Sequence, residues 1–225
     1  ETLFGLDALF HHKTNVMPWL GVRWAEEPSP IAFRTYGYAW GQMEPDHPGQ
    51  FAQDRAAARA QGRPFPVNFF ANNSYYREDV EGEWKPWKVY SIPSLFYEPP
   101  KWAIIPGTAH AAHALLKPEA EKHWRNYCIE VAKSYPEQYP DREENIYQIT
   151  WEPQGDEERD EGLLRIYEIA YKALHETDPK AMVIGPASSG SMGSVAWDER
   201  VLRKGLGKYL DGYVIHPYLS KVPYN

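Results

Sequence analysis

Cysteine is almost absent from this sequence of 225 residues, and Cys128 is the only one. An internal disulfide is therefore excluded, and a metal site built from cysteines is not expected. Cysteine usage consequently does not define the compartment. The chain starts at Glu1 rather than at a methionine, which is compatible with a removed leader and with a secreted or periplasmic location.

Long apolar runs and an excess of basic residues are missing as well. No run approaches the roughly 18 apolar residues that a membrane span needs, so we expect no membrane partner. The formal net charge is −7. Because no basic patch is available to neutralise phosphates, we expect no nucleic-acid partner either. Hydrophobic residues make up 43% of the chain, which is enough to form a sizeable core.

Sequence motifs for several common chemistries cannot be found. His110 and His113 could present two ligands on one helical face, but there is no H-E-x-x-H motif and no obvious third ligand. The serine-hydrolase motif G-x-S-x-G and the phosphate loop G-x-x-x-x-G-K-[ST] are both missing. No G-x-G-x-x-G motif follows the first predicted strand. We therefore predict no metal and no cofactor.

Aromatic residues and prolines, in contrast, are abundant. Aromatics reach 15%, with nine Trp and sixteen Tyr, and there are twenty prolines. Flat rings with a polar group suit a surface that stacks on sugar rings, and they suit a large core equally well. The longest irregular stretch, residues 74–116, holds Trp84, Trp87 and Trp102. Loops of this length are usually functional, so we expect it to lie over the site.

Strand and helix patterns alternate along the chain, which predicts a parallel sheet with helical crossovers. For the second strand, residues 21–24 and 31–38 compete, and we favour the later segment. An acidic run at 156–161 suits the positive end of a helix, and we interpret it as a solvated helix start rather than a calcium site. The predicted strands are 3–10, 31–38, 65–71, 145–151, 181–186 and 211–216, and the predicted helices are 54–61, one from 117 through 135, one ending at 175, and 201–206.

One stretch, residues 145–154, places a carboxylate at the end of a predicted buried strand. Its first half is β-branched and aromatic, which favours a strand, and Pro153 cannot donate to a ladder, so the strand ends there. Glu152 then lies beside Trp151 at the carboxyl end of the strand, where parallel barrels build their catalytic sites. Because neighbouring strand residues point to opposite faces, we expect an aromatic ring other than Trp151 to shield Glu152.

The order of these motifs resembles the clan A glycoside hydrolases, which include β-xylosidases, iduronidases and many endo-glycanases. The resemblance lies in Trp-Glu-Pro at 151–153, in Val-Ile-His-Pro-Tyr at 214–218, and in residues 33–51, which are similar to the clan's second strand and following loop. It implies a TIM (β/α)8 barrel. Residues 1–225 would form a single barrel domain with strands one to six of eight, incomplete at the C-terminus. Counting strands alone, an open doubly wound sheet with five or six strands remains an alternative.

The resemblance also implies roles for individual residues. Glu152 matches the general acid/base, and Arg34 matches an arginine that supports the nucleophile. His216 and Tyr218 match positions that line the sugar site. Trp151 stands where the clan usually has an asparagine that binds the sugar 2-hydroxyl, which suggests a different sugar or a distant family.

Four polar residues can also be interpreted structurally. Arg34 in an apolar strand must meet a carboxylate, either catalytic or structural. His216 could belong to the core, and Asn72, at the end of the third predicted strand, could either bind hydroxyls or form a turn. Glu44 in the loop after the second strand is usually structural in the clan.

The predicted function is a retaining glycoside hydrolase that acts on a polysaccharide or oligosaccharide. Such enzymes need two carboxyl groups about 5–5.5 Å apart. The clan's nucleophile is a glutamate at the end of strand seven, which would lie beyond residue 225 in a C-terminal barrel segment that this chain would need as its partner. The alternatives are a non-catalytic carbohydrate-binding protein on a degenerate barrel, and an α/β enzyme of another class in which Trp-Glu-Pro is coincidental.

Overall fold

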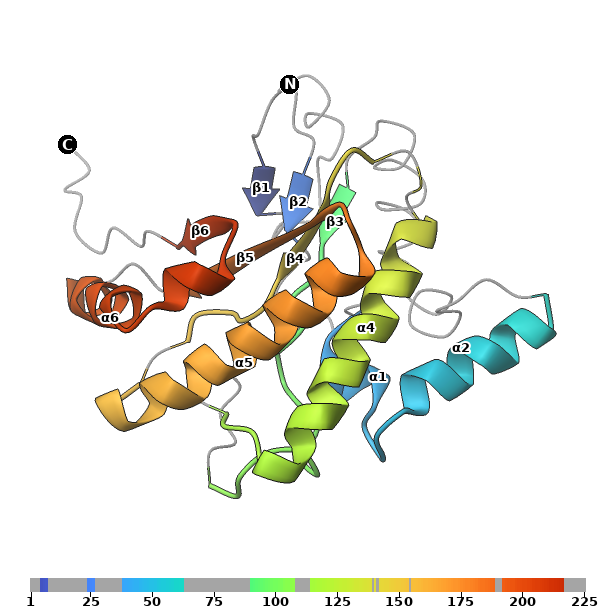
Figure 1. Ribbon diagram of the computed structural model, residues 1–225, viewed down its shortest axis with the longest axis horizontal. Helices are drawn as coiled ribbons and strands as arrows, with labels where there is room; N and C mark the ends of the chain where they lie inside the picture. Colours follow the sequence, from blue (N-terminus) through green and yellow to red (C-terminus); the bar gives the residue numbers. More distant parts are fainter. Residues whose placement is uncertain are drawn as a thin grey trace, which may run out of the picture.

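The structure of the protein is a computed structural model that describes residues 5–7, 24–26, 38–62, 90–107, 114–138, 140, 142–153, 155–188 and 192–216. In the described chain β1 and β2 precede α1 and α2, and from β3 onward short strands alternate with helices (Figure 1). The strands are β1 (Gly5–Asp7), β2 (Trp24–Glu26), β3 (Tyr90–Ile92), β4 (Asn145–Gln148), β5 (Ala181–Ser188) and β6 (Gly212–Ile215). The helices are α1 (Trp40–Met43), α2 (Gln50–Ala60), α4 (Glu121–Gln138), α5 (Glu157–Thr177) and α6 (Met192–Arg203), with 3-10 helices η4 (Pro118–Ala120) and η5 (Leu206–Tyr209).

All described strand pairs are parallel, and they form two three-stranded sheets in the orders β1-β2-β3 and β4-β5-β6. A bridge between Ser94 and Gln148 joins the two sheets just after β3. There the Leu95 amide donates to the Gln148 carbonyl (2.9 Å), and the Gln148 amide donates to the Pro93 carbonyl (3.0 Å). Neighbouring strands therefore follow one another in chain order, and their carboxyl ends lie along one edge.

The predicted TIM (β/α)8 barrel is wrong. The described strands form small parallel sheets that are not closed, whereas the barrel closes eight strands into a ring. Parallel pairing with helical crossovers is present, because α5 connects β4 to β5 and α6 connects β5 to β6. The alternating pattern specifies this local unit. Closure depends in addition on strand number, tilt and stagger, which the local pattern does not encode.

The three later strand predictions are confirmed in position, because 145–151, 181–186 and 211–216 contain or overlap β4, β5 and β6. The strand β4 ends at Gln148, which is earlier than predicted. Its continuation leaves the regular ladder as it approaches the turn that carries Glu152.

Two predictions in the first half of the chain are wrong. The strand between β1 and β3 is β2, which overlaps the rejected segment 21–24. Of the preferred segment 31–38, only Tyr38 is described, and it lies in a turn. The strand β3 lies inside 74–116, where we expected no regular structure. The prediction 3–10 is confirmed in position, because it contains β1, and the prediction 65–71 lies outside the described residues.

Helices α4 and α5 lie side by side and cover β4 and β5 (Figure 1). On α4 the side chains of Trp124, Cys128, Val131 and Tyr135 are buried, as their helical spacing predicts. The buried positions on α5 include Ile166, Tyr167, Ala170 and Leu174. Each fully buried large apolar side chain contributes roughly 1.5–3 kcal/mol, so this contact layer is a main source of stability.

The short helix α1 is held by an aromatic cluster around Trp40. The Trp40 ring centroid lies 5.2 Å from that of Trp124 and 5.3 Å from that of Trp102. The Trp40 amide donates to the Leu95 carbonyl (2.9 Å), which ties α1 to the segment after β3. A four-residue helix has little intrinsic stability, so these tertiary contacts determine where α1 forms.

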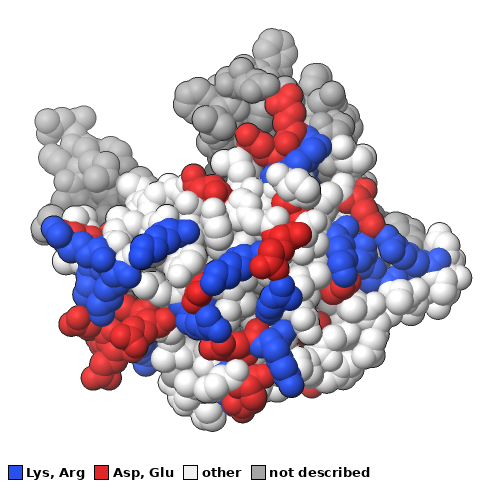
Figure 2. Space-filling view, in the orientation of Figure 1, with Lys and Arg blue, Asp and Glu red and all other residues white. Residues whose placement is uncertain are grey.

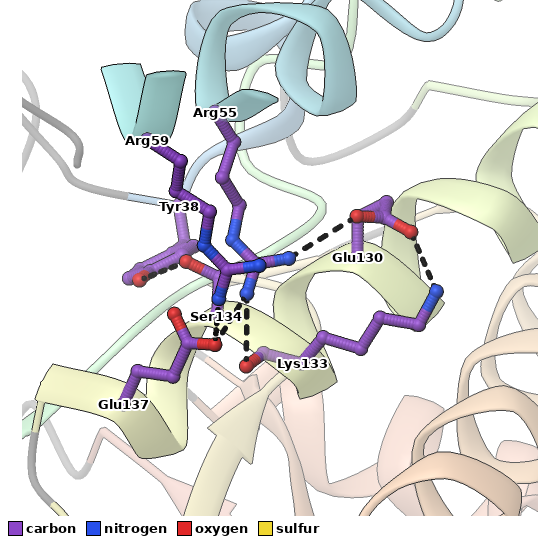
Figure 3. A network of polar contacts seen from close by, with 7 residues as sticks. All are labelled: Tyr38, Arg55, Arg59, Glu130, Lys133, Ser134 and Glu137. Carbon is purple, nitrogen blue, oxygen red and sulfur yellow. Dashed lines mark hydrogen bonds and ion pairs between the residues drawn. The ribbon is translucent and has the colours of Figure 1, made fainter. Parts of the chain in front are cut away.

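Arginines on α2 join this helix to α4 (Figure 3). Arg55 donates to Glu137 (2.8 Å) and to the Lys133 carbonyl (3.3 Å), and Arg59 pairs with the same Glu137. The Arg55 side chain is only 9% exposed, and a charge so buried needs such partners. The helix begins at Gln50, earlier than the predicted start at 54.

The acidic run at 156–161 forms the start of α5, and part of it binds α6. Asp160 is buried and accepts hydrogen bonds from Arg200 Nε (2.7 Å), while Lys204 Nζ lies 3.1 Å from the same carboxylate. Burial alone would raise the pKa of Asp160, but these two cations lower it. The predicted helix 201–206 is wrong in extent, because α6 begins at Met192 and gives way to a turn before Gly205, whose φ is 107°.

The surface that carries α4 and α5 mixes charges of both signs (Figure 2). Arg165 on α5 pairs with Glu121 on α4 (2.7 Å) and with Glu168 on its own helix (2.8 Å). Such exposed pairs contribute little stability, and they identify this face as a solvated one. None of the described helices is long and apolar enough to cross a membrane.

Candidate functional site

The turn after β4 presents Glu152 in an unusual backbone conformation. Its φ is 44°, in the left-handed region that costs a non-glycine residue roughly 1–2 kcal/mol. Two features maintain it. The Glu152 amide donates to the Ala187 carbonyl (2.9 Å), and the following Pro153 disfavours the right-handed helical region for Glu152. Strain of this kind is often found at functional sites.

The Glu152 carboxylate contacts His216, with Oε1 lying 3.0 Å from Nδ1. The two side chains are 27% and 13% exposed, so the pair is sheltered but reaches solvent. His216 follows β6, and its amide donates to the Ser188 carbonyl at the end of β5 (2.7 Å). The carboxyl ends of three adjacent strands therefore meet at this pair.

Two aromatic rings adjoin this pair. The Trp151 ring lies edge-on to the His216 ring, with centroids 4.9 Å apart, and the Tyr97 ring lies 6.4 Å from the Trp151 ring. We predicted that Trp151 and Glu152 point to opposite faces, but both contact His216. The reason is the left-handed φ of Glu152, which interrupts the alternation of a strand.

A hydrogen-bonded layer beneath the turn fixes its position. Thr150 Oγ1 lies 2.7 Å from the Tyr167 hydroxyl and donates to the Pro186 carbonyl (3.0 Å). Gly185, which precedes Pro186 through a cis peptide bond, lies against this layer. A Cβ at position 185 would lie 2.1 Å from the Tyr167 hydroxyl oxygen, so only glycine allows this approach.

On the β6 side, Asp198 of α6 organises two further hydroxyl groups. It accepts hydrogen bonds from Ser188 (3.1 Å) and from Tyr213 (2.6 Å). Burial, followed by the contact with Asp198, raises the pKa of Tyr213. The phenol therefore stays protonated at neutral pH and keeps α6 attached to the sheet edge next to the site.

The structure brings together three of the predicted site residues, namely Trp151, Glu152 and His216. Arg34, Asn72 and Tyr218 lie outside the described residues, as do Trp84 and Trp87 of the long loop and the pair His110 and His113. Trp102, expected over the site, packs on Trp40 and donates its indole N–H to the Glu44 carbonyl (2.9 Å).

Sequence reasoning missed Tyr97. A signal for it was present, because Tyr97-Glu98-Pro99 repeats the aromatic–Glu–Pro pattern of residues 151–153. Burial raises the pKa of Tyr97, and the charges of Glu98 and Glu152 raise it further. The phenol is therefore close to both carboxylates.

Two other buried carboxylates are structural. Glu44 accepts hydrogen bonds from Trp40 Nε1 (2.9 Å) and from the Gly49 amide (3.0 Å), and so stabilises the turn between α1 and α2. Asp178 accepts hydrogen bonds from Asn145 (2.7 Å) and Tyr147 (2.8 Å) at the amino end of β4. That end lies opposite the carboxyl edge where parallel α/β proteins build their sites, so these contacts serve stability.

Among the described residues, no three His, Cys, Asp or Glu side chains are grouped so that they could hold a metal ion. The Glu152–His216 pair supplies two potential ligands only. What this site offers is a partly exposed carboxylate, an imidazole that contacts it, and two adjacent rings.

No protein family matches this chain, and no curated protein matches it either. The functional assignment therefore rests on the chemistry and geometry of the site.

Proposed function

We propose that this protein hydrolyses glycosidic bonds of a polysaccharide or oligosaccharide by a retaining mechanism, with Glu152 as the general acid/base. The observation that carries the proposal is the Glu152–His216 pair, which is partly exposed at the carboxyl ends of β4, β5 and β6. Ligands of parallel α/β sheets bind at this edge, whether the sheet is open or closed. The proposal does not depend on a barrel.

In the first step, Glu152 donates its proton to the oxygen of the leaving sugar. In the second step, the same carboxylate removes a proton from the attacking water. His216 contacts Oε1 through Nδ1 (3.0 Å) and limits rotation of the carboxylate. The imidazole acts here as a positioning residue.

Two neighbouring rings shield the Glu152 carboxylate. Trp151 and Tyr97 form an edge-to-face pair next to Glu152. Trp151 is almost completely buried, as is Tyr97, so their main effect is to exclude water from one side of the carboxylate.

Retention also requires a nucleophilic carboxylate that attacks the anomeric carbon from about 5–5.5 Å away from the acid/base. The resemblance to clan A glycosidases assigns this role to a glutamate, its support to Arg34, and lining of the sugar site to Tyr218. Asn72 is a further candidate for binding hydroxyls, because it ends a predicted strand. These roles stay predictions.

A Glu152→Gln variant tests the proposal. With xylan, mixed-linkage β-glucan, β-mannan and agarose as probes, we expect turnover of the cleaved polysaccharide to fall by about 10²–10⁴-fold, the usual contribution of a general acid/base. Aryl glycosides with a 2,4-dinitrophenyl leaving group need no proton and should lose less. The matched control is Glu119→Gln, an exposed glutamate of η4, which should keep native turnover.

Native turnover by a folded Glu152→Gln protein contradicts the assignment. Saccharide binding without turnover by the unmodified chain, measured by calorimetry on the same probes, would favour the second candidate, a non-catalytic carbohydrate-binding protein. Both measurements require that the melting temperatures of the variants match that of the unmodified chain.

A further inference from the structure

A second glutamate occupies a position equivalent to Glu152 on the neighbouring strand. Glu98 follows Tyr97 and precedes Pro99, as Glu152 follows Trp151 and precedes Pro153. Its φ is 45°, against 44° for Glu152. Among the described non-glycine residues the left-handed conformation occurs at Glu98, at Glu152 and at Ala187 near the end of β5, and the first two are the ones that carry a carboxylate.

The two glutamates follow segments that lie side by side. The bridge pairs Ser94 with Gln148, and beyond it the Phe96 amide donates to the Ile149 carbonyl (2.7 Å). The residues that precede the two glutamates are still in contact, because the Tyr97 ring centroid lies 6.4 Å from that of Trp151.

Close packing fixes the backbone at Glu98. A Cβ on Gly41 of α1 would lie 1.9 Å from the Glu98 carbonyl oxygen, so the helix and this peptide are in direct contact. Strained residues persist only where their surroundings determine them strongly. The position of Glu98 is thus set by α1 on one side and by the segment after β4 on the other.

The side chain of Glu98 differs from the structural carboxylates of this protein. Glu98 is exposed, and within the described residues its carboxylate makes no hydrogen bond and no ion pair. Glu44 and Asp178, in contrast, are buried and bonded. A strained, rigid residue whose carboxylate remains available has no evident structural role.

We propose that Glu98 is a saccharide-binding residue of the Glu152 site and accepts hydrogen bonds from hydroxyls of the sugar bound next to Glu152. The inference rests on the proposed glycosidase function and names its substrate class. An ionised carboxylate accepts hydrogen bonds and donates none, so its partner must present O–H or N–H groups. The Glu98 carboxylate repels uronate or sulfate groups. The sugar at this position is therefore neutral.

Binding measurements on a non-cleaving background test this inference. Titration calorimetry compares three folded proteins, namely Glu152→Gln, Glu152→Gln with Glu98→Gln, and Glu152→Gln with Glu119→Gln as control. The probes are xylohexaose, cellohexaose, mannohexaose and neoagarohexaose, with hexagalacturonate as the acidic probe. For the neutral sugar that binds, we expect Glu98→Gln to weaken binding about tenfold to a hundredfold, the usual effect of losing hydrogen bonds to a charged group.

The control should bind as tightly as Glu152→Gln alone, and hexagalacturonate should bind more weakly than the best neutral probe. Unchanged binding after Glu98→Gln overturns the inference, as does a preference for hexagalacturonate. Reduced turnover of the Glu98→Gln single variant with intact binding also overturns it, because Glu98 would then act on the chemistry.

Failure of the parent proposal can be recognised separately. Native turnover by Glu152→Gln removes the glycosidase assignment, yet the binding comparison in the unmodified background still reports on Glu98. If Glu98→Gln does not fold, Glu98→Asn is the second variant, because asparagine tolerates the left-handed conformation. Glu98→Asp keeps the charge and should retain more binding than either.

Discussion

Glu44 and Glu152 occupy similar sequence contexts but different environments. Each precedes a proline. Glu44 accepts a hydrogen bond from Trp40, and Glu152 directly follows Trp151 in sequence. Glu44 is 3% exposed, and both of its carboxylate oxygens accept hydrogen bonds from Trp40 and Gly49. Glu152 is partly exposed and contacts an imidazole from a different strand. One carboxylate stabilises a turn, and the other is presented to solvent.

The difference shows that a Glu-Pro pair does not determine the role of its glutamate. The surrounding donors do. At Glu44 the donors come from residues four and five positions away in sequence, so the local chain completes the structure. At Glu152 the partner is His216, which is brought in only by the pairing of β4, β5 and β6. A Glu44 variant should therefore change mainly the free energy of unfolding, and a His216 variant should change mainly turnover.

The largest expected effect is on stability, at the support of Glu152. In Gly185→Ala the new methyl group would collide with the Tyr167 hydroxyl, at 2.1 Å. Overpacking and backbone strain together cost about 2–4 kcal/mol, measured as the free energy of unfolding in urea. The control is Gly207→Ala, whose Cβ would have its nearest neighbour at 3.8 Å.

Combining Gly185→Ala with Tyr167→Phe removes the colliding oxygen. The double variant should be more stable than the sum of the two single effects predicts. Equal costs for the Gly185 and Gly207 variants would contradict this account of the turn.

The next effect concerns activity. His216→Phe keeps an aromatic ring beside Trp151 and removes Nδ1, so the Glu152 carboxylate loses a positioning contact. A hydrogen bond to a charged group contributes about 1.5–3 kcal/mol, and turnover should fall about tenfold to a hundredfold. The pH profile of kcat/KM should change as well, because an ionisable neighbour is lost.

The matched control is His175→Phe. His175 of α5 pairs with Asp211 before β6 (2.8 Å) and makes no hydrogen bond or ion pair with Glu152 or His216. An unchanged pH profile in His216→Phe, with normal turnover, would show that the imidazole does not position Glu152.

A smaller effect is expected at Glu44. Glu44→Gln offers one acceptor oxygen where two are used, so the N–H of Trp40 or of Gly49 loses its partner. The cost should be about 1–2 kcal/mol of unfolding free energy. Turnover per folded molecule should stay native, and a turnover loss comparable to that of Glu152→Gln would remove the distinction between the two glutamates.

The smallest effect is the pH dependence of that cost. Burial raises the pKa of Glu44, and the hydrogen bonds from Trp40 and Gly49 offset part of the rise. A carboxyl whose folded-state pKa is raised binds its proton more tightly in the folded protein, so its contribution to stability is lost as pH rises from the ordinary value of 4.5. Glutamine does not titrate. The stability difference between the unmodified chain and Glu44→Gln should therefore be larger near pH 4 than near pH 7, and a difference that grows with pH contradicts the assignment.

How far the sequence predicts this protein depends on the distance between the interacting residues. The buried stripe Trp124, Cys128, Val131 and Tyr135 on α4 is confirmed, because helical spacing is a local property. The strands β4, β5 and β6 were found for the same reason. The start of α6 and the strands β2 and β3 were not predicted, since these elements depend on contacts with distant segments.

The candidate site shows the same division. Glu152, Trp151 and His216 could be proposed from the end of a strand and from a resemblance, and the structure brings them together. The side on which the Trp151 ring lies could not be predicted, because no local sequence pattern predicts a left-handed φ at Glu152. Tyr97 was missed although its Tyr-Glu-Pro context repeats that of Trp151.

By itself, the sequence determined the parallel pairing of the later strands and the core face of α4. These features follow from periodicity. Only the tertiary structure decided that the described sheets stay open, that Glu44 is bonded within its own turn, and that Glu152 lies against His216 with Glu98 on an adjacent segment. The physical reason is that register and packing join residues distant in sequence, and no local pattern specifies which of them will meet.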